Sequence, residues 1–202
     1  MKEAFIFLDN SNIFVSAKNV ATAREGVDAG YQVRIQFDNL LRLASADRTV
    51  GFAVAVGSVP PPLRHVWNRL EQAGVRVELF ERGAMSNREQ AIDQALQVHM
   101  LRTAFDRNGN PGTAVVLTGD GAGFLDGVGF HADLERMHKR GWGIEVLAWE
   151  RTCNARLKNW VNQVGVFVPL EDYYDSITFT EDDTGVLRKS TVLDLSNRTL
   201  AS

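Results

Sequence analysis

The sequence predicts an α/β protein with three layers, in which helices cover both faces of a mostly parallel, Rossmann-like sheet of about five to six strands. Two observations lead to this fold class. Short apolar runs rich in β-branched residues recur along the chain, and segments of helical periodicity lie between most of them. Strands that alternate with helices form parallel sheets through right-handed crossovers.

Six apolar runs are predicted to be strands. The run that contains Val115 and Val116 has no charged residue, which is typical of a central strand whose two faces are both covered by helices. Each run is short and is bounded by polar residues, glycine or proline. The predicted strands are residues 4–8, 50–57, 75–80, 114–118, 144–149 and 164–170.

The segments between these strands give helix signals of different strength. Residues 61–74 begin with prolines and end at Gly74, and residues 86–105 begin with Ser86 and Asn87, either of which can cap a helix. Residues 37–46 are predicted to form a further helix. Residues 19–35 are only weakly periodic, and we expect an extended loop or a β-hairpin there.

The chain is long enough for one substantial core. It has 202 residues, of which 45% are hydrophobic and 23% are charged. We expect a domain over residues 1–170 and an acidic and polar extension over 171–202, with a short strand within residues 176–180 and a surface-packed or partly mobile remainder.

The cysteine content and the charge limit the classes of function. Cys153 is the single cysteine, which excludes an intrachain disulfide and a cysteine zinc cluster and favours a reducing, cytoplasmic setting. The first apolar run is too short to cross a bilayer, so we expect no membrane partner. The formal net charge of −3 gives no general attraction to nucleic acid.

Aspartates follow two of the predicted strands. Asp9 follows the first strand, and Asp120 comes after residues 114–118 and is followed by Gly121 and Gly123. The carboxyl ends of parallel strands lie at one edge of the sheet, where open α/β sheets bind ligands. The two carboxylates are therefore expected to converge there.

A third carboxylate interrupts the apolar surface of the helix predicted over 86–105. Burying Asp93 in its ionised form without a partner would cost several kcal/mol, and a metal ion would supply that partner. Carboxylate ligands without a cysteine or histidine cluster suit Mg²⁺ or Mn²⁺. The sequence therefore predicts an Mg²⁺ or Mn²⁺ site formed by Asp9, Asp93 and Asp120.

Simpler explanations exist for some of these residues. Asp120 taken alone, and likewise Asn12, could be the N-cap of a helix. A flavodoxin-like or receiver-like phosphotransfer domain also gathers acidic residues at strand ends. The absence of a suitably placed lysine after a later strand argues against that reading.

The segments FIFLDNSNIF, REQAIDQALQVHML and VVLTGDGAGF together resemble the NYN domain family, a branch of the PIN-like ribonucleases, over nearly all of residues 4–150. Family members carry Asp and, three residues later, Asn after the first strand, then Asp in a helix, then Ser/Thr-Gly-Asp after a central strand. The matching residues here are Asp9, Asn12, Asp93, Thr118, Gly119 and Asp120. The resemblance implies a PIN-like fold and a metal-dependent endoribonuclease.

The resemblance also implies roles for individual residues. Asp9, Asp93 and Asp120 would be metal ligands, and Asn12 would complete the catalytic set by orienting a ligand carboxylate, the attacking water or a phosphate oxygen. Ser11 and Thr118 are expected to bind substrate beside these residues. Apart from the resemblance, Arg82 and Arg88 are expected to bind substrate phosphates because they bracket the loop that leads into the helix of Asp93. The expected partner is single-stranded RNA, and a homodimer is left open.

Two departures from the family pattern bear on activity. The family carries a further Asp two residues after the Gly-Asp element, where this chain has Ala122, and Asp126 or Glu89 are the candidates to replace it. His99 stands where family helices often hold another acidic residue, and as a lone histidine it fits packing better than metal binding. The alternative function is therefore a catalytically weak or inactive module that binds RNA or protein.

Overall fold

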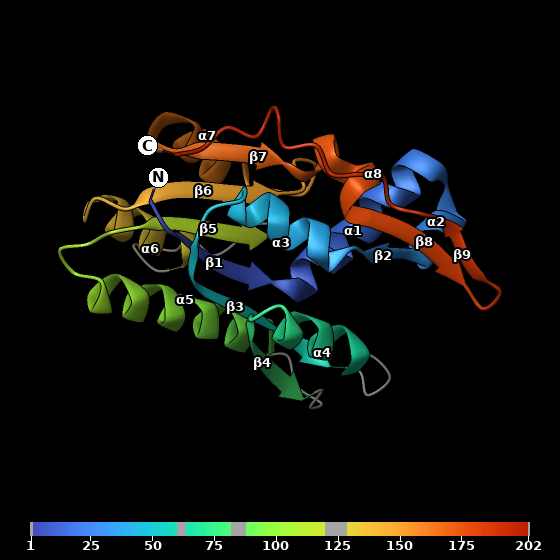
Figure 1. Ribbon diagram of the computed structural model, residues 1–202, viewed down its shortest axis with the longest axis horizontal. Helices are drawn as coiled ribbons and strands as arrows, with labels where there is room; N and C mark the ends of the chain where they lie inside the picture. Colours follow the sequence, from blue (N-terminus) through green and yellow to red (C-terminus); the bar gives the residue numbers. More distant parts are fainter. Residues whose placement is uncertain (1, 60–63, 82–87, 120–128, 202) are drawn as a thin grey trace.

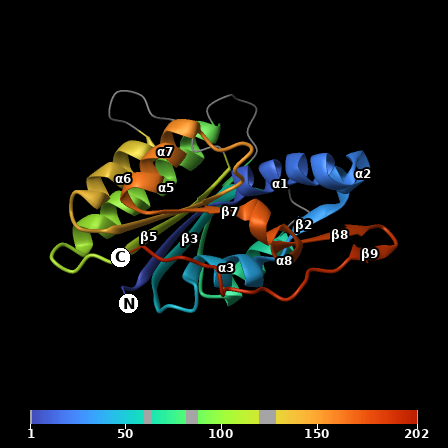
Figure 2. The same ribbon diagram turned by 90° about the horizontal axis from the view of Figure 1, so that it is seen from above.

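The computed structural model describes residues 2–59, 64–81, 88–119 and 129–201. Its centre is a six-stranded sheet in the order β4-β3-β1-β5-β6-β7, in which every pairing is parallel. Helices cover both faces (Figures 1 and 2), which confirms the predicted three-layer α/β/α class. The strands are β1 (Ala4–Asp9), β3 (Val50–Val59), β4 (Arg76–Glu81), β5 (Thr113–Thr118), β6 (Gly143–Ala148) and β7 (Val166–Pro169).

The helices divide between the two faces of this sheet. One core contains apolar side chains of α1, α3 and α4, and the other contains those of α5, α6 and α7. Figure 2 shows α5, α6 and α7 together on one side and α3 on the other. The helices are α1 (Asn10–Glu25), α2 (Val27–Gln32), α3 (Phe37–Ser45), α4 (Arg64–Gln72), α5 (Arg88–Asp106), α6 (Phe130–His138), α7 (Ala155–Val164) and α8 (Tyr174–Ile177).

The prediction of a loop or β-hairpin over residues 19–35 is wrong. Helix α1 continues to Glu25, α2 follows, and only β2 (Val33–Ile35) is extended. The helical period is weak because α1 is buried mainly through small residues such as Ala17 and Ala21. Gly26, with a φ of 105°, separates the two helices in a conformation that favours glycine.

A second, smaller sheet lies beyond the carboxyl end of β1 (Figure 1). It is antiparallel, with the order β2-β8-β9, where β8 is Thr178–Asp182 and β9 is Gly185–Arg188. The strand expected within residues 176–180 is present as β8, although its first two residues belong to α8.

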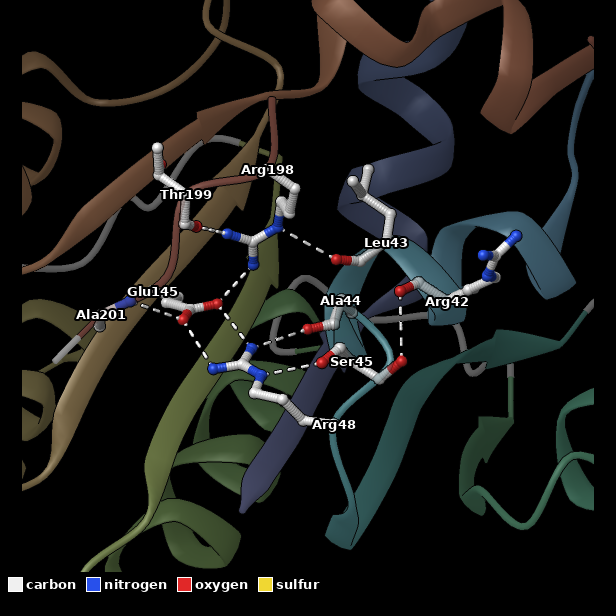
Figure 3. Close-up of polar contacts among 9 residues, drawn as sticks. All are labelled: Arg42, Leu43, Ala44, Ser45, Arg48, Glu145, Arg198, Thr199 and Ala201. Atoms are coloured by element: carbon white, nitrogen blue, oxygen red, sulfur yellow. Dashed lines mark hydrogen bonds and ion pairs between the residues drawn. The ribbon is translucent and has the colours of Figure 1, made fainter. Parts of the chain in front are cut away.

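The C-terminal segment is fastened to the main sheet by a buried charge network (Figure 3). Glu145 of β6 is fully buried and accepts hydrogen bonds from Nη1 and Nη2 of Arg48, each at 2.8 Å, and from Arg198. The backbone N–H of Ala201 donates to the same carboxylate at 2.9 Å. A single carboxylate therefore joins β6, the α3–β3 connection and the end of the chain.

The tryptophans belong to the two cores: Trp67, Trp142 and Trp149 are buried and Trp160 is partly buried. His131 is buried as well. Its exposed fraction is 3%, and its ring centroid lies 4.8 Å from that of Trp160. Within the described residues, no helix combines the length and the apolar character that crossing a bilayer requires.

Candidate active site

Asp9 lies where β1 ends and α1 begins. It is the last residue of β1 and the N-cap of α1, and its exposed fraction is only 1%. Its Oδ1 accepts a hydrogen bond from the backbone N–H of Asn12 at 3.0 Å, and its Oδ2 accepts one from Nδ2 of Asn12 at 2.7 Å. Two donors from one residue thus fix the plane of the carboxylate.

This arrangement settles the alternative explanation of Asn12. The N-cap of α1 is Asp9, and Asn12 lies within the first turn of the helix, so the prediction that Asn12 could be an N-cap is wrong. Its side chain instead holds the Asp9 carboxylate in place, as neighbouring groups commonly do for metal-binding or catalytic carboxylates.

Strand β5 ends beside Asp9 and presses against the first turns of α1. Leu117 pairs with Leu8, so Thr118, which is fully buried, stands next to the end of β1. A Cβ atom on Gly119 would lie 2.4 Å from the backbone oxygen of Asn12, so only glycine fits there. Asp120 follows Gly119 directly but lies outside the described residues.

Helix α5 begins at the carboxyl edge of the sheet and ends near its amino edge, and Asp93 lies within its first two turns. Arg107, just after α5, forms an ion pair with Glu3, just before β1, and α5 packs on β1. Asp93 lies about 21 Å along the helix from Arg107, at about 1.5 Å per residue. Asp9 lies about 20 Å along the strand from Glu3, at about 3.3 Å per residue. The half-buried Asp93 therefore belongs to the end of α5 at the carboxyl edge of the sheet.

The turn after β6 supports this edge, a role that sequence reasoning missed. Nε1 of Trp149 donates to the backbone oxygen of Ile13 at 3.0 Å. Oγ1 of Thr152 donates to the backbone oxygen of Gly119 at 2.7 Å and lies 3.1 Å from Oγ of Ser16. These hydrogen bonds connect the ends of β5 and β6 to α1, and no local sequence motif predicts them.

The predicted substrate-binding residues are only partly described. Ser11 lies in the first turn of α1, where its Oγ would be 3.4 Å from a Cβ atom on Gly57 of β3. Arg88 and Glu89 begin α5, but the surroundings of their side chains lie outside the described part of the structure. Arg82 and Asp126 also lie outside the described residues.

The donor chemistry at this edge fits a hard divalent cation. Asp9 offers carboxylate oxygens that are buried and oriented, which is the ligand type of Mg²⁺ and Mn²⁺. Within the described residues, no three acidic, histidine or cysteine side chains form a metal-binding group. A complete site would need a ligand from the segment that begins at Asp120.

His99 is a packing residue of α5. Its exposed fraction is 7%, and its Nε2 lies 2.9 Å from Oε1 of Glu78 on β4. Its ring centroid lies 5.8 Å from that of Phe52. These partners belong to β3 and β4, so the histidine is engaged in joining α5 to that side of the sheet.

Comparisons with known proteins agree with this architecture. A family model described as NYN domain matches residues 3–170. A crystal structure of a protein of unknown function from Vibrio parahaemolyticus superposes with a TM-score of 0.59 at 16% sequence identity, covering 92% of this chain and 97% of the other. That similarity concerns the fold alone. No curated relative matches the chain.

Proposed function

Because the chain belongs to the NYN domain family, a family of PIN-like nucleases, we propose that it is a metal-dependent endoribonuclease. Its active site, formed by Asp9, Asp93 and Asp120, would cleave single-stranded RNA. The observation that carries the proposal is the buried Asp9 carboxylate, held through both oxygens by Asn12. The carboxyl edge of a parallel sheet is where such folds bind ligands, and a carboxylate fixed in this way can coordinate a metal ion with a defined geometry.

The proposed chemistry is hydrolysis of a phosphodiester bond. Mg²⁺ or Mn²⁺ would polarise the scissile phosphate and lower the pKa of the attacking water. Asp9, Asp93 and Asp120 would hold the cation, with Asp126 or Glu89 as candidates for a further ligand. Asn12 keeps Asp9 in the required orientation, which supports a positioning role.

Substrate binding is proposed at the edges of the same site. Ser11 and Thr118 lie at the ends of α1 and β5 nearest Asp9. The partly exposed Ser11 has a hydroxyl group suited to phosphate or ribose oxygens, whereas Thr118 is fully buried and is proposed to shape this edge of the site from below. Arg82 and Arg88 flank the segment before α5 in the sequence and are proposed to bind the phosphates of the RNA backbone.

Gel-resolved cleavage of labelled single-stranded RNA tests the proposal. The wild type should cleave with Mn²⁺ or Mg²⁺ and be inert with chelator, and Asp9→Asn and Asp120→Asn should each remove cleavage. Asp106→Asn, an exposed residue at the far end of α5, is the matched control and should cleave at the wild-type rate. If Asp9→Asn cleaves as fast as the wild type, the activity belongs to another site or protein. If the wild type is inert yet retains RNA, the alternative of an inactive binding module is correct.

A further inference from the structure

The side of α1 that faces α2 carries an aromatic and basic surface formed by Phe14, Lys18 and Tyr31, here called the α1–α2 surface. The Nζ atom of Lys18 lies 5.9 Å from the ring centroid of Phe14 and 5.9 Å from that of Tyr31. Tyr31 is 72% exposed, so one face of this arrangement is open to solvent. Nothing in the proposed chemistry at Asp9 uses these residues.

The charge of Lys18 is not neutralised within the described part of the chain. Several other basic residues pair with acidic groups, as Lys158 does with Glu150 and Arg34 does with Glu181. Among the described residues, Lys18 has aromatic neighbours and no ion pair with a carboxylate. Its positive charge therefore remains available to an anionic partner, next to rings that can stack on flat groups.

The α1–α2 surface leads away from the candidate active site. Ser11, Phe14 and Lys18 follow one another at helical spacings of three and four residues, so they lie along one side of α1. At about 1.5 Å per residue, Phe14 is about 8 Å and Lys18 about 14 Å along the helix from Asp9. This is the range that the nucleotides next to a scissile phosphate would cover.

The position of Tyr31 is set by close packing between α1 and α2. A Cβ atom on Gly30 would lie 2.0 Å from Oγ1 of Thr22 and 3.2 Å from the backbone oxygen of Lys18. Oγ1 of Thr22 also donates a hydrogen bond to that same oxygen at 2.9 Å. The backbone that carries the neighbouring Tyr31 is therefore held close to Lys18.

We propose that the α1–α2 surface binds single-stranded RNA as it enters or leaves the site at Asp9. A base stacks on the exposed ring of Tyr31, beside the partly buried Phe14, and Lys18 contacts a backbone phosphate. A single strand is specified because bases inside a duplex are already stacked on one another and cannot use Tyr31. The inference rests on the proposed function, since it takes the strand on this surface to be the substrate of that site.

Fluorescence anisotropy of a labelled oligouridylate of about twelve nucleotides tests the proposal. Titrations are run in EDTA, so that binding is measured separately from cleavage, at salt concentrations from about 50 to 200 mM. The variants are Lys18→Ala, Tyr31→Ala and Tyr31→Phe. The matched controls are Lys139→Ala and Phe105→Ala, an exposed lysine and an exposed ring outside the surface.

The two kinds of contact predict different results. Lys18→Ala should reduce the slope of log K against log salt by about 0.7, the value for one phosphate contact on a single strand. Tyr31→Ala should weaken binding about tenfold with an unchanged slope, and Tyr31→Phe should restore it. Both controls should bind as the wild type does.

Three results would overturn the proposal. They are an unchanged slope in Lys18→Ala, equal binding by Tyr31→Ala and the wild type, and duplex RNA that binds as tightly as the single strand. The two proposals can fail separately. The catalytic proposal is decided by RNA cleavage in Asp9→Asn, and this one is decided by RNA binding without metal.

Discussion

The two oxygens of Asp9 are both hydrogen bonded to Asn12, Oδ1 to its backbone N–H at 3.0 Å and Oδ2 to its side-chain Nδ2 at 2.7 Å. The same carboxylate therefore caps helix α1 and is turned into a fixed orientation at the carboxyl end of β1. One side chain therefore has a structural role, capping α1, and a proposed chemical role, binding a metal ion. Substitutions of Asp9 and Asn12 can separate these two roles.

Two substitutions of Asp9 should have different effects on stability. Asparagine caps helices about as well as aspartate, so Asp9→Asn should stay folded while losing RNA cleavage by at least about 100-fold, because a ligand charge is removed. Asp9→Ala should lose the same activity and about 1 kcal/mol of unfolding free energy. Urea unfolding and cleavage assays on both variants measure the separation. Equal stability in the two variants would mean that the cap does not contribute.

Asn12→Ala should lower activity more than stability. Loss of the Nδ2 donor leaves Oδ2 of Asp9 without the hydrogen bond that orients it, and a loss of about 10- to 100-fold in metal-dependent cleavage is expected. Asn19→Ala, an exposed asparagine on the same helix, is the control. Similar rates for Asn12→Ala and the control would remove Asn12 from the proposed catalytic set.

Glu145→Gln should destabilise the protein strongly. The substitution leaves the guanidinium groups of Arg48 and Arg198 buried without their counter-charge, which costs about 3–5 kcal/mol. For a chain of this size the melting temperature should fall on the order of 10 °C. The exposed Glu150 provides the control, Glu150→Gln, which should melt within about 2 °C of the wild type. A comparable small change in Glu145→Gln would show that the network is dispensable.

His131 should make stability depend on pH. Burial lowers its pKa below the ordinary value of 6.5, while the nearby Glu135 opposes this shift and Arg156 adds to it. The unfolded chain then binds a proton more readily than the folded one, so stability is lost as the pH falls below about 6.5. His131→Phe keeps a ring beside Trp160 without the proton. As the pH is lowered from about 7.5 to about 5, the melting temperature of His131→Phe should rise relative to that of the wild type. A difference in melting temperature that does not change with pH would contradict the assignment.

The sequence was sufficient for the parts of the fold that depend on local pattern. β-branched runs such as Val115–Val116 predicted the buried strands, and each predicted strand of the main sheet is present with ends shifted by a few residues. The position of Asp9 at the carboxyl end of β1 follows from the same pattern. The NYN resemblance agrees with the family match.

Other features depend on contacts between distant segments and could not be predicted. Helices α1 and α2 are stabilised by packing against each other around Gly30, although their sequence has little amphipathic pattern. Glu145 resembles a solvent-facing residue within its strand, and its partner Arg198 is 53 residues away in the sequence. The burial of His131 depends likewise on Trp160 from another helix.

Melting in the presence of Mn²⁺ tests the central claim, that Asp9 belongs to a divalent-metal site. A cation at about 100 times its dissociation constant stabilises the folded state by about 2.7 kcal/mol. The melting temperature of the wild type and of the control Asp106→Asn should therefore rise by about 5–10 °C. That of Asp9→Asn should stay within about 1 °C of its metal-free value. An equal rise in Asp9→Asn, or no rise in the wild type at millimolar Mn²⁺, would contradict the account.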